Sequence, residues 1–126
     1  MGKILLVEDE KNIVLGVRTC LEAVGYHVHV VEDGEEALDY VTRHRPDLIL
    51  LDLMLPKVDG FEVCRALKNN EETKDIPIIV LTARTGMEDR QRVAELGAES
   101  YMTKPFRPRE LWDEIKHYLP DKKTEN

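Results

Sequence analysis

Short apolar runs alternate along the sequence with longer stretches whose apolar residues recur at helical spacing. Uninterrupted apolar runs occur at 4–7, directly after Lys3, and at 48–51 and 78–81, and an alternating, β-branched stretch occurs at 27–31. Runs of four or five apolar residues without a period of two are typical of strands buried on both faces of a parallel sheet. Residues 100–103 predict a fifth strand that is shorter and weaker.

Each predicted strand is followed by a predicted amphipathic helix. The first helical stripe runs from Ile13 to Val24, and Gly25 ends it as a C′ residue. Further stripes predict helices around 37–41, 61–67, 87–96 and 108–119. Strand and helix therefore alternate five times, with crossovers long enough for parallel pairing. The pattern predicts one α/β domain with a three-layer, doubly wound sheet.

The length and the charge limit the function classes. A chain of 126 residues forms one domain of ordinary size, which we place at 1–120, followed by a charged, flexible tail at 121–126. The 18 basic and 25 acidic residues give a formal charge of −7, which nucleic-acid phosphates would repel. We therefore expect no direct binding to nucleic acid.

The distribution of apolar residues also bears on location. No run approaches the roughly 18 apolar residues of a membrane span, and the N-terminus lacks a signal-peptide pattern. Cys20 and Cys64 have no metal-ligand spacing and fall in predicted helices, so we expect buried free thiols. These features predict a cytoplasmic protein without a membrane contact.

Candidate chemistry lies where the predicted strands end. The carboxyl ends of parallel strands meet along one edge of such a sheet, where ligands bind. The residues at these ends are Glu8, Asp9, Asp52, Thr82 and Lys104. Three neighbouring carboxylates repel one another, and Mg²⁺ relieves that repulsion with few carboxylate ligands. A carboxylate can also attack phosphorus while a metal ion and a Lys ammonium neutralise phosphoryl oxygens.

Taken singly, each of these residues has an ordinary structural explanation. The acids near Glu8 suit the N-terminus of a helix, Thr82 suits a helix cap, and Lys104 suits a solvated loop. None of these explanations predicts that all of these residues occur at successive strand ends. The joint occurrence therefore favours a site.

Four sequence features, in this order and at this spacing, carry a resemblance to a known family: the acidic pair Glu8-Asp9, Asp52 within LLDLMLPKVDG, Thr82-Ala83 within IIVLTAR, and Tyr101 followed by Lys104-Pro105-Phe106. The chain resembles the receiver domain of bacterial two-component response regulators over 3–119, in particular the single-domain chemotaxis type. The resemblance implies a flavodoxin-like fold with five parallel strands in the order 2-1-3-4-5 and five helices.

The resemblance also implies a phosphorylation-dependent signalling switch. Asp52 resembles the acceptor of a phosphoryl group from a histidine kinase or a phosphotransfer protein. Asp9 resembles the main Mg²⁺ ligand and Glu8 the second acid, and the Met54 backbone carbonyl completes the protein ligands. Because many members have Asp where this chain has Glu8, the longer side chain is expected to bind a metal-bound water. We therefore expect the protein to catalyse only its own phosphorylation and slow dephosphorylation, and not to be an enzyme in the usual sense.

Further residues match the positions that contact the phosphate and pass on the signal. Thr82 and Lys104 resemble the phosphate-contacting pair, and Tyr101 resembles an aromatic residue that turns inward from solvent on activation. Met54 and Arg84 match positions that flank the acyl phosphate and limit the approach of water. The resemblance implies an output face made by the fourth helix, the fifth strand and the fifth helix. We expect this face to bind a separate output protein or a second copy of the chain.

Three alternatives remain at this stage. A flavodoxin-like nucleotide-binding protein shares the predicted topology, but the acids from Glu8 to Glu10 stand where a phosphate-binding loop would be needed. A phosphatase with an aspartyl nucleophile is the second, although Met54 stands where a general acid would be needed two residues after Asp52. A purely structural receiver is the third, and the complete set of site residues argues against it.

Overall fold

The computed structural model describes residues 2–83 and 86–119, and within them five strands and five helices alternate. The strands are β1 (Lys3–Val7), β2 (His27–Val31), β3 (Leu48–Asp52), β4 (Ile78–Thr82) and β5 (Ser100–Thr103). The helices are α1 (Lys11–Ala23), α2 (Gly34–Arg43), α3 (Gly60–Lys68), α4 (Met87–Glu95) and α5 (Pro108–Tyr118). The predicted alternation is confirmed, with helix boundaries that differ by up to three residues. The expected tail at 121–126 lies outside the described residues.

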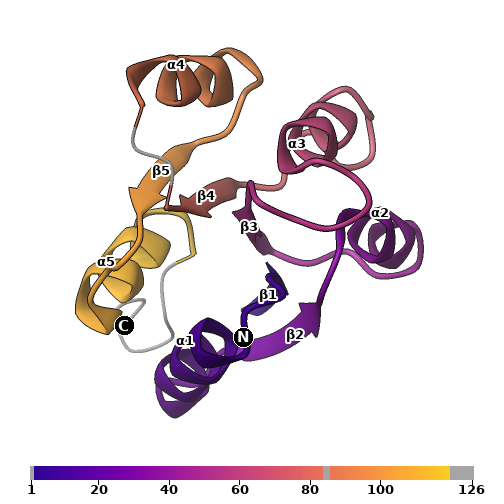
Figure 1. Ribbon diagram of the computed structural model, residues 1–126. Helices are drawn as coiled ribbons and strands as arrows, with labels where there is room; N and C mark the ends of the chain where they lie inside the picture. The colour runs from indigo at the N-terminus through magenta and orange to yellow at the C-terminus, as the bar shows by residue number, and fades with distance from the viewer. Residues whose placement is uncertain (1, 84–85, 120–126) are drawn as a thin grey trace.

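All five strands pair in parallel, in the order β2-β1-β3-β4-β5 (Figure 1). The predicted flavodoxin-like order is therefore confirmed. β3 and β4 are buried along their whole length, as is β1 after Lys3. β2 and β5 are the edge strands, and they include exposed or half-buried residues. Burial on two faces is the reason that the central strands are uniformly apolar.

Helices cover both faces of the sheet. α1 and α5 pack on one face, and α2, α3 and α4 pack on the other (Figure 1). Successive residues of a strand point to opposite faces. Leu50 accordingly belongs to the core under α1 and α5, whereas Leu51 belongs to the core under the other three helices. Among the described residues, no helix combines the length and the apolarity needed to cross a membrane.

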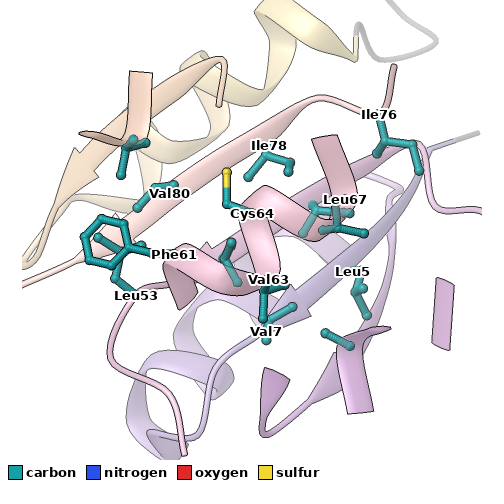
Figure 2. Packing of buried hydrophobic residues seen from close by; sticks show 14 of the residues in the cluster. Leu5, Val7, Leu53, Phe61, Val63, Cys64, Leu67, Ile76, Ile78 and Val80 are labelled. Carbon is teal, nitrogen blue, oxygen red and sulfur yellow. The ribbon is translucent and has the colours of Figure 1, made fainter. Parts of the chain in front are cut away.

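The core under α3 extends to the sheet edge where the strands end. Figure 2 shows Phe61, Cys64 and Leu67 of α3 over the sheet, and Phe61 lies close to Leu53. Leu53 directly follows Asp52, and it is 3% exposed. Packing therefore fixes the backbone on the C-terminal side of Asp52.

The expectation for the cysteines is half right. Cys64 is fully buried, and burial raises the pKa of its thiol to about 11, which keeps it neutral. Cys20 is only partly buried, so the prediction was wrong for this residue. Its Sγ lies 3.8 Å from the Pro108 carbonyl oxygen, where α1 passes the start of α5. The helical pattern placed Cys20 on the apolar stripe, but the stripe is wider than the part that the sheet covers.

Gly60 allows the first turn of α3 to approach the end of β3. Its N–H donates to the Leu53 carbonyl oxygen at 3.2 Å. A Cβ atom at Gly60 would lie 2.5 Å from Leu53 Cα and 2.7 Å from the Asp52 carbonyl oxygen. These are backbone atoms that cannot move aside without shifting the strand.

We therefore expect Gly60→Ala to lower the free energy of unfolding by about 1–3 kcal/mol, as overpacking does. Gly16→Ala is the matched control, because nothing lies within 4 Å of a Cβ at this position of α1. This control should raise the free energy of unfolding by about 0.5–1 kcal/mol, since alanine restricts the unfolded chain. Urea unfolding measures both. A Gly60→Ala protein as stable as the wild type would contradict the close approach.

Candidate functional site

Three carboxylates meet at the C-terminal edge of the sheet. Val7 pairs with Leu51 in the register of β1 and β3, so Glu8 and Asp52 follow at the same level. Glu8, Asp9 and Asp52 each offer an oxygen within 4.8 Å of the other two. Glu8 and Asp52 are buried, whereas Asp9 is exposed. The cluster thus has two acids beneath the surface and one on it.

Lys104 enters this cluster from the end of β5. Its backbone N–H donates to the Thr82 carbonyl oxygen at 2.8 Å, which fixes its height above the sheet. Its Nζ lies 2.7 Å from Glu8 Oε1 and 3.2 Å from Asp52 Oδ2. Burial opposes the charge of this ammonium group, but the two carboxylates outweigh burial and raise the pKa of Lys104. One half-buried ammonium group is therefore paired with two buried acids.

Glu8 is the least satisfied member of the cluster. Burial raises its pKa to about 7, and the negative charge of Asp52 adds to this, while Lys104 opposes it. Oε2 accepts the Glu10 N–H at 3.2 Å. Oε1 forms the ion pair but accepts no hydrogen bond of normal geometry from the described residues. A buried carboxylate oxygen with spare acceptor capacity, beside two further acids, fits a hard divalent cation such as Mg²⁺.

The Asp52 carboxylate is held on its other side by the loop that follows β3. The Met54 N–H donates to Asp52 Oδ1 at 3.1 Å, while Oδ2 faces Lys104. Met54 itself is 57% exposed. Arg84, the other predicted flanking residue, lies outside the described residues.

Thr82 and Tyr101 lie on the neighbouring strands β4 and β5. Thr82 is fully buried and pairs with Thr103 in the strand register. Tyr101 pairs with Val80 and is half-buried, packed against the core under α2, α3 and α4. The Arg90 guanidinium of α4 lies over its ring, 4.8 Å from the centroid. The ring therefore contacts α4 and is not free in solvent as the sequence suggested.

A groove lies between α1 and α5, on the opposite face of the sheet from α4. It has a volume of about 120 Å³, and its lining includes Ile13, Val17, Phe106 and Leu111. The exposed side chain of Leu15 also lies on α1. The groove is thus lined in part by apolar side chains.

The sequence predicted which residues lie at this edge of the sheet but not how they pair. The contact of Lys104 with Glu8 is shorter than its contact with Asp52, and sequence reasoning gave Lys104 only a role toward phosphate. The one available signal was the long side chain of Glu8, which reaches farther than an aspartate. The hydrogen bond from the Met54 N–H to Asp52 was also not predicted, because residue spacing does not determine the turn geometry after a strand.

Comparison with known proteins agrees with this geometry. The family described as response regulator receiver domain matches residues 4–116. The transcriptional regulatory protein PhoP of alkaline phosphatase synthesis in Bacillus subtilis is 48% identical over 117 residues, which are 93% of this chain and 48% of that protein. A probable transcriptional regulator, ycf27, of Porphyridium aerugineum is 45% identical over 117 residues, again 93% and 48% of the two chains. The chain thus spans about half the length of these relatives.

Solved structures share the fold. The chemotaxis protein CheY4 of Vibrio cholerae superposes with a TM-score of 0.88 at 34% identity, over 94% of this chain and 99% of that one. The receiver domain of a sensor histidine kinase from Pseudomonas aeruginosa superposes with a TM-score of 0.85 at 35% identity, over 93% and 96% of the chains. That structure has a magnesium ion coordinated in its active-site cleft. With this fold, this acidic edge and these matches, the chain belongs to the response regulator receiver domains of two-component systems.

Proposed function

We propose that the protein is a phosphorylation-dependent switch that takes a phosphoryl group from a histidine kinase or phosphotransfer protein onto Asp52. The observation that carries this proposal is the buried Asp52 carboxylate at a strand end, 3.2 Å from the Lys104 ammonium and clustered with two further acids. A nucleophilic carboxylate for phosphoryl transfer needs both neighbours, because the incoming group is itself anionic.

In the proposed step, an oxygen of Asp52 attacks the phosphorus atom of the donor. The bond from phosphorus to the donor imidazole nitrogen breaks, and that nitrogen keeps the electron pair. Asp52 becomes an acyl phosphate. The Lys104 ammonium, already beside Asp52 Oδ2, turns to the phosphoryl oxygens, and the Thr82 hydroxyl donates a hydrogen bond to one of them.

Glu8, Asp9, Asp52 and the Met54 carbonyl are the residues that would hold Mg²⁺. We propose that Asp9 binds the ion directly and that the longer Glu8 binds it through a water. When bound, Mg²⁺ supplies positive charge that offsets the acids and the phosphoryl oxygens. This assignment is supported by the spare acceptor capacity of buried Glu8 Oε1.

Dephosphorylation is proposed to be slow and intrinsic to the protein. Met54 stands two residues after Asp52, where a turnover phosphatase of the aspartyl type would need a general acid. Met54 is exposed, and its side chain is proposed to limit the approach of water. The resemblance implies the same role for Arg84. The protein therefore acts as a signalling element and not as an enzyme that turns over phosphate esters.

The signal is proposed to leave through the face formed by α4, β5 and α5. Phosphorylation adds charge and strong acceptor oxygens at Asp52. When Thr82 moves toward them, it leaves space into which Tyr101 can turn, away from Arg90. Such couplings are typically worth about 1–3 kcal/mol, so the unphosphorylated protein already visits the active shape.

The proposed partners occupy two different faces. The groove between α1 and α5 has a partly apolar lining, and we propose that it receives the phosphoryl donor. A separate output protein or a second copy of the chain is proposed for the α4-β5-α5 face. We further propose a cytoplasmic location and no direct contact with nucleic acid by these residues.

Asp52→Asn should abolish phosphorylation, because the amide preserves the shape but lacks the nucleophilic oxygen. Wild type and variant are incubated with acetyl phosphate and Mg²⁺, and the intact proteins are weighed. Asp59→Asn is the matched control, since Asp59 is exposed and caps α3 through the Phe61 N–H. Undiminished phosphate on Asp52→Asn would place the acceptor elsewhere.

Mg²⁺ should raise the melting temperature of the unphosphorylated protein, because it binds the folded acid cluster. At an ion concentration of about 100 times the Kd, the free energy of unfolding should rise by about 2.7 kcal/mol. Asp9→Ala should lose this gain. Glu10→Ala should keep it, because Glu10 is exposed and lies outside the three-acid cluster. Equal stabilisation of wild type and Asp9→Ala would refute the proposed ligand set.

Activation by beryllofluoride, a mimic of the phosphoryl group, should change the amide NMR shifts of Thr82, Tyr101 and α4. The physical reason is that Tyr101 exchanges its contact with Arg90 for the space behind Thr82. Asp52→Asn serves as the control without a binding site for the mimic. Changes confined to α1, with Tyr101 and its neighbours silent, would exclude this output route.

A further inference from the structure

The N-terminus of α2 contacts the loop 53–59, which carries Met54 and connects β3 with α3. A Cβ atom at Gly34 would lie 2.6 Å from the Val58 carbonyl oxygen and 2.8 Å from Val58 Cβ. It would also lie 2.7 Å from Val63 Cγ2. Gly34 is buried and Val58 half-buried, so this is a close contact inside the structure. Any side chain at Gly34 would push the middle of the loop.

An ion pair crosses the same boundary. Asp33 caps α2 by accepting the Glu36 N–H at Oδ1, at 2.8 Å. Its Oδ2 lies 3.6 Å from Lys57 Nζ. Lys57 has a φ of 66°, in the left-handed region that non-glycine residues seldom adopt. Because the Lys57 side chain is 60% exposed, this pair adds little stability, but it joins the same two segments as the Gly34 contact.

The two ends of the loop are attached to the site and to α3. At its start the Met54 N–H donates to Asp52 Oδ1 at 3.1 Å. At its end Asp59 caps α3, and the Gly60 N–H donates to the Leu53 carbonyl oxygen at 3.2 Å. Between these points the loop has no strand or helix of its own. Its middle is therefore held by contacts with other segments, and α2 supplies a rigid one.

We propose that the N-terminus of α2, through Gly34 and its contact with Val58, positions the loop that orients the Asp52 carboxylate and carries the Met54 carbonyl. Gly34 and Val58 are positioning residues, and they act on the site without touching the reacting atoms. The proposal rests on the proposed function, because the quantity that it predicts is the affinity of the acid cluster for Mg²⁺. Helix α2 thereby affects the orientation of the metal ligands, although it is not part of the proposed output face.

The test is calorimetric titration of Mg²⁺ into the full chain, with no phosphoryl donor present. Removal of a group that orients metal ligands typically weakens metal binding by about 10- to 100-fold, and we expect Gly34→Ala to raise the Kd by about tenfold. Val58→Ala keeps the atoms that face Gly34 but removes the two methyl groups by which half-buried Val58 packs against the core under α2, α3 and α4, so it loosens the loop side of this packing. This variant should also raise the Kd for Mg²⁺. If Gly34→Ala does not fold, Val58→Ala by itself tests the proposal.

A stability control separates positioning from general destabilisation. Ile115→Ala creates a cavity in the core under α1 and α5, on the opposite face of the sheet. It should lower the melting temperature while leaving the Kd for Mg²⁺ within about twofold of the wild type, because packing loss on that face does not move the loop. Initial rates of phosphorylation by acetyl phosphate should follow the same order as the affinities.

The outcomes distinguish this proposal from the proposed function. If the wild type binds Mg²⁺ and accepts phosphate, but Gly34→Ala and Val58→Ala match the wild type in Kd, the positioning role is refuted. The same holds if Ile115→Ala weakens Mg²⁺ binding as much as Gly34→Ala does. If the wild type itself neither binds Mg²⁺ nor accepts phosphate, the proposed function fails first, and the proposal fails with it.

Discussion

The burial of two carboxylates beside one ammonium group is the constraint on which the site depends. Glu8 and Asp52 lie beneath the surface, and Lys104 lies between them. Buried charges are costly unless they are paired, and two acids with one base leave an excess of negative charge. The cluster lies at the strand ends, where exposed Asp9 adds a third acid to this excess.

The same constraint links the site to the rest of the sheet. β1 and β3 must end at the same level to bring Glu8 to Asp52, and the register of Val7 with Leu51 provides this. Lys104 must follow β5 at the same level. The hydrogen bond from the Lys104 N–H to the Thr82 carbonyl oxygen joins the ends of β5 and β4 there. A change in charge at the acids can therefore act on both strands that lead to α4 and α5.

Most of the fold was predictable from local patterns. Apolar runs such as 48–51 identified the central strands because burial on both faces leaves no polar position in them. Gly25 ended the first helix as predicted, with a φ of 102° that favours glycine. The burial of Cys20 was predicted wrongly, because helical spacing defines a stripe but not how much of that stripe a neighbouring element covers.

The sequence by itself determined the strand ends, and with them the set of acids, Thr82 and Lys104 that reach one edge of the sheet. Local periodicity and chain direction suffice for this, because parallel strands all end on the same side. The tertiary structure alone decided that Lys104 lies closer to Glu8 than to Asp52. It also decided that Gly34 touches the loop after β3. Such contacts join residues distant in sequence, and their lengths depend on how whole layers pack, which no local spacing encodes.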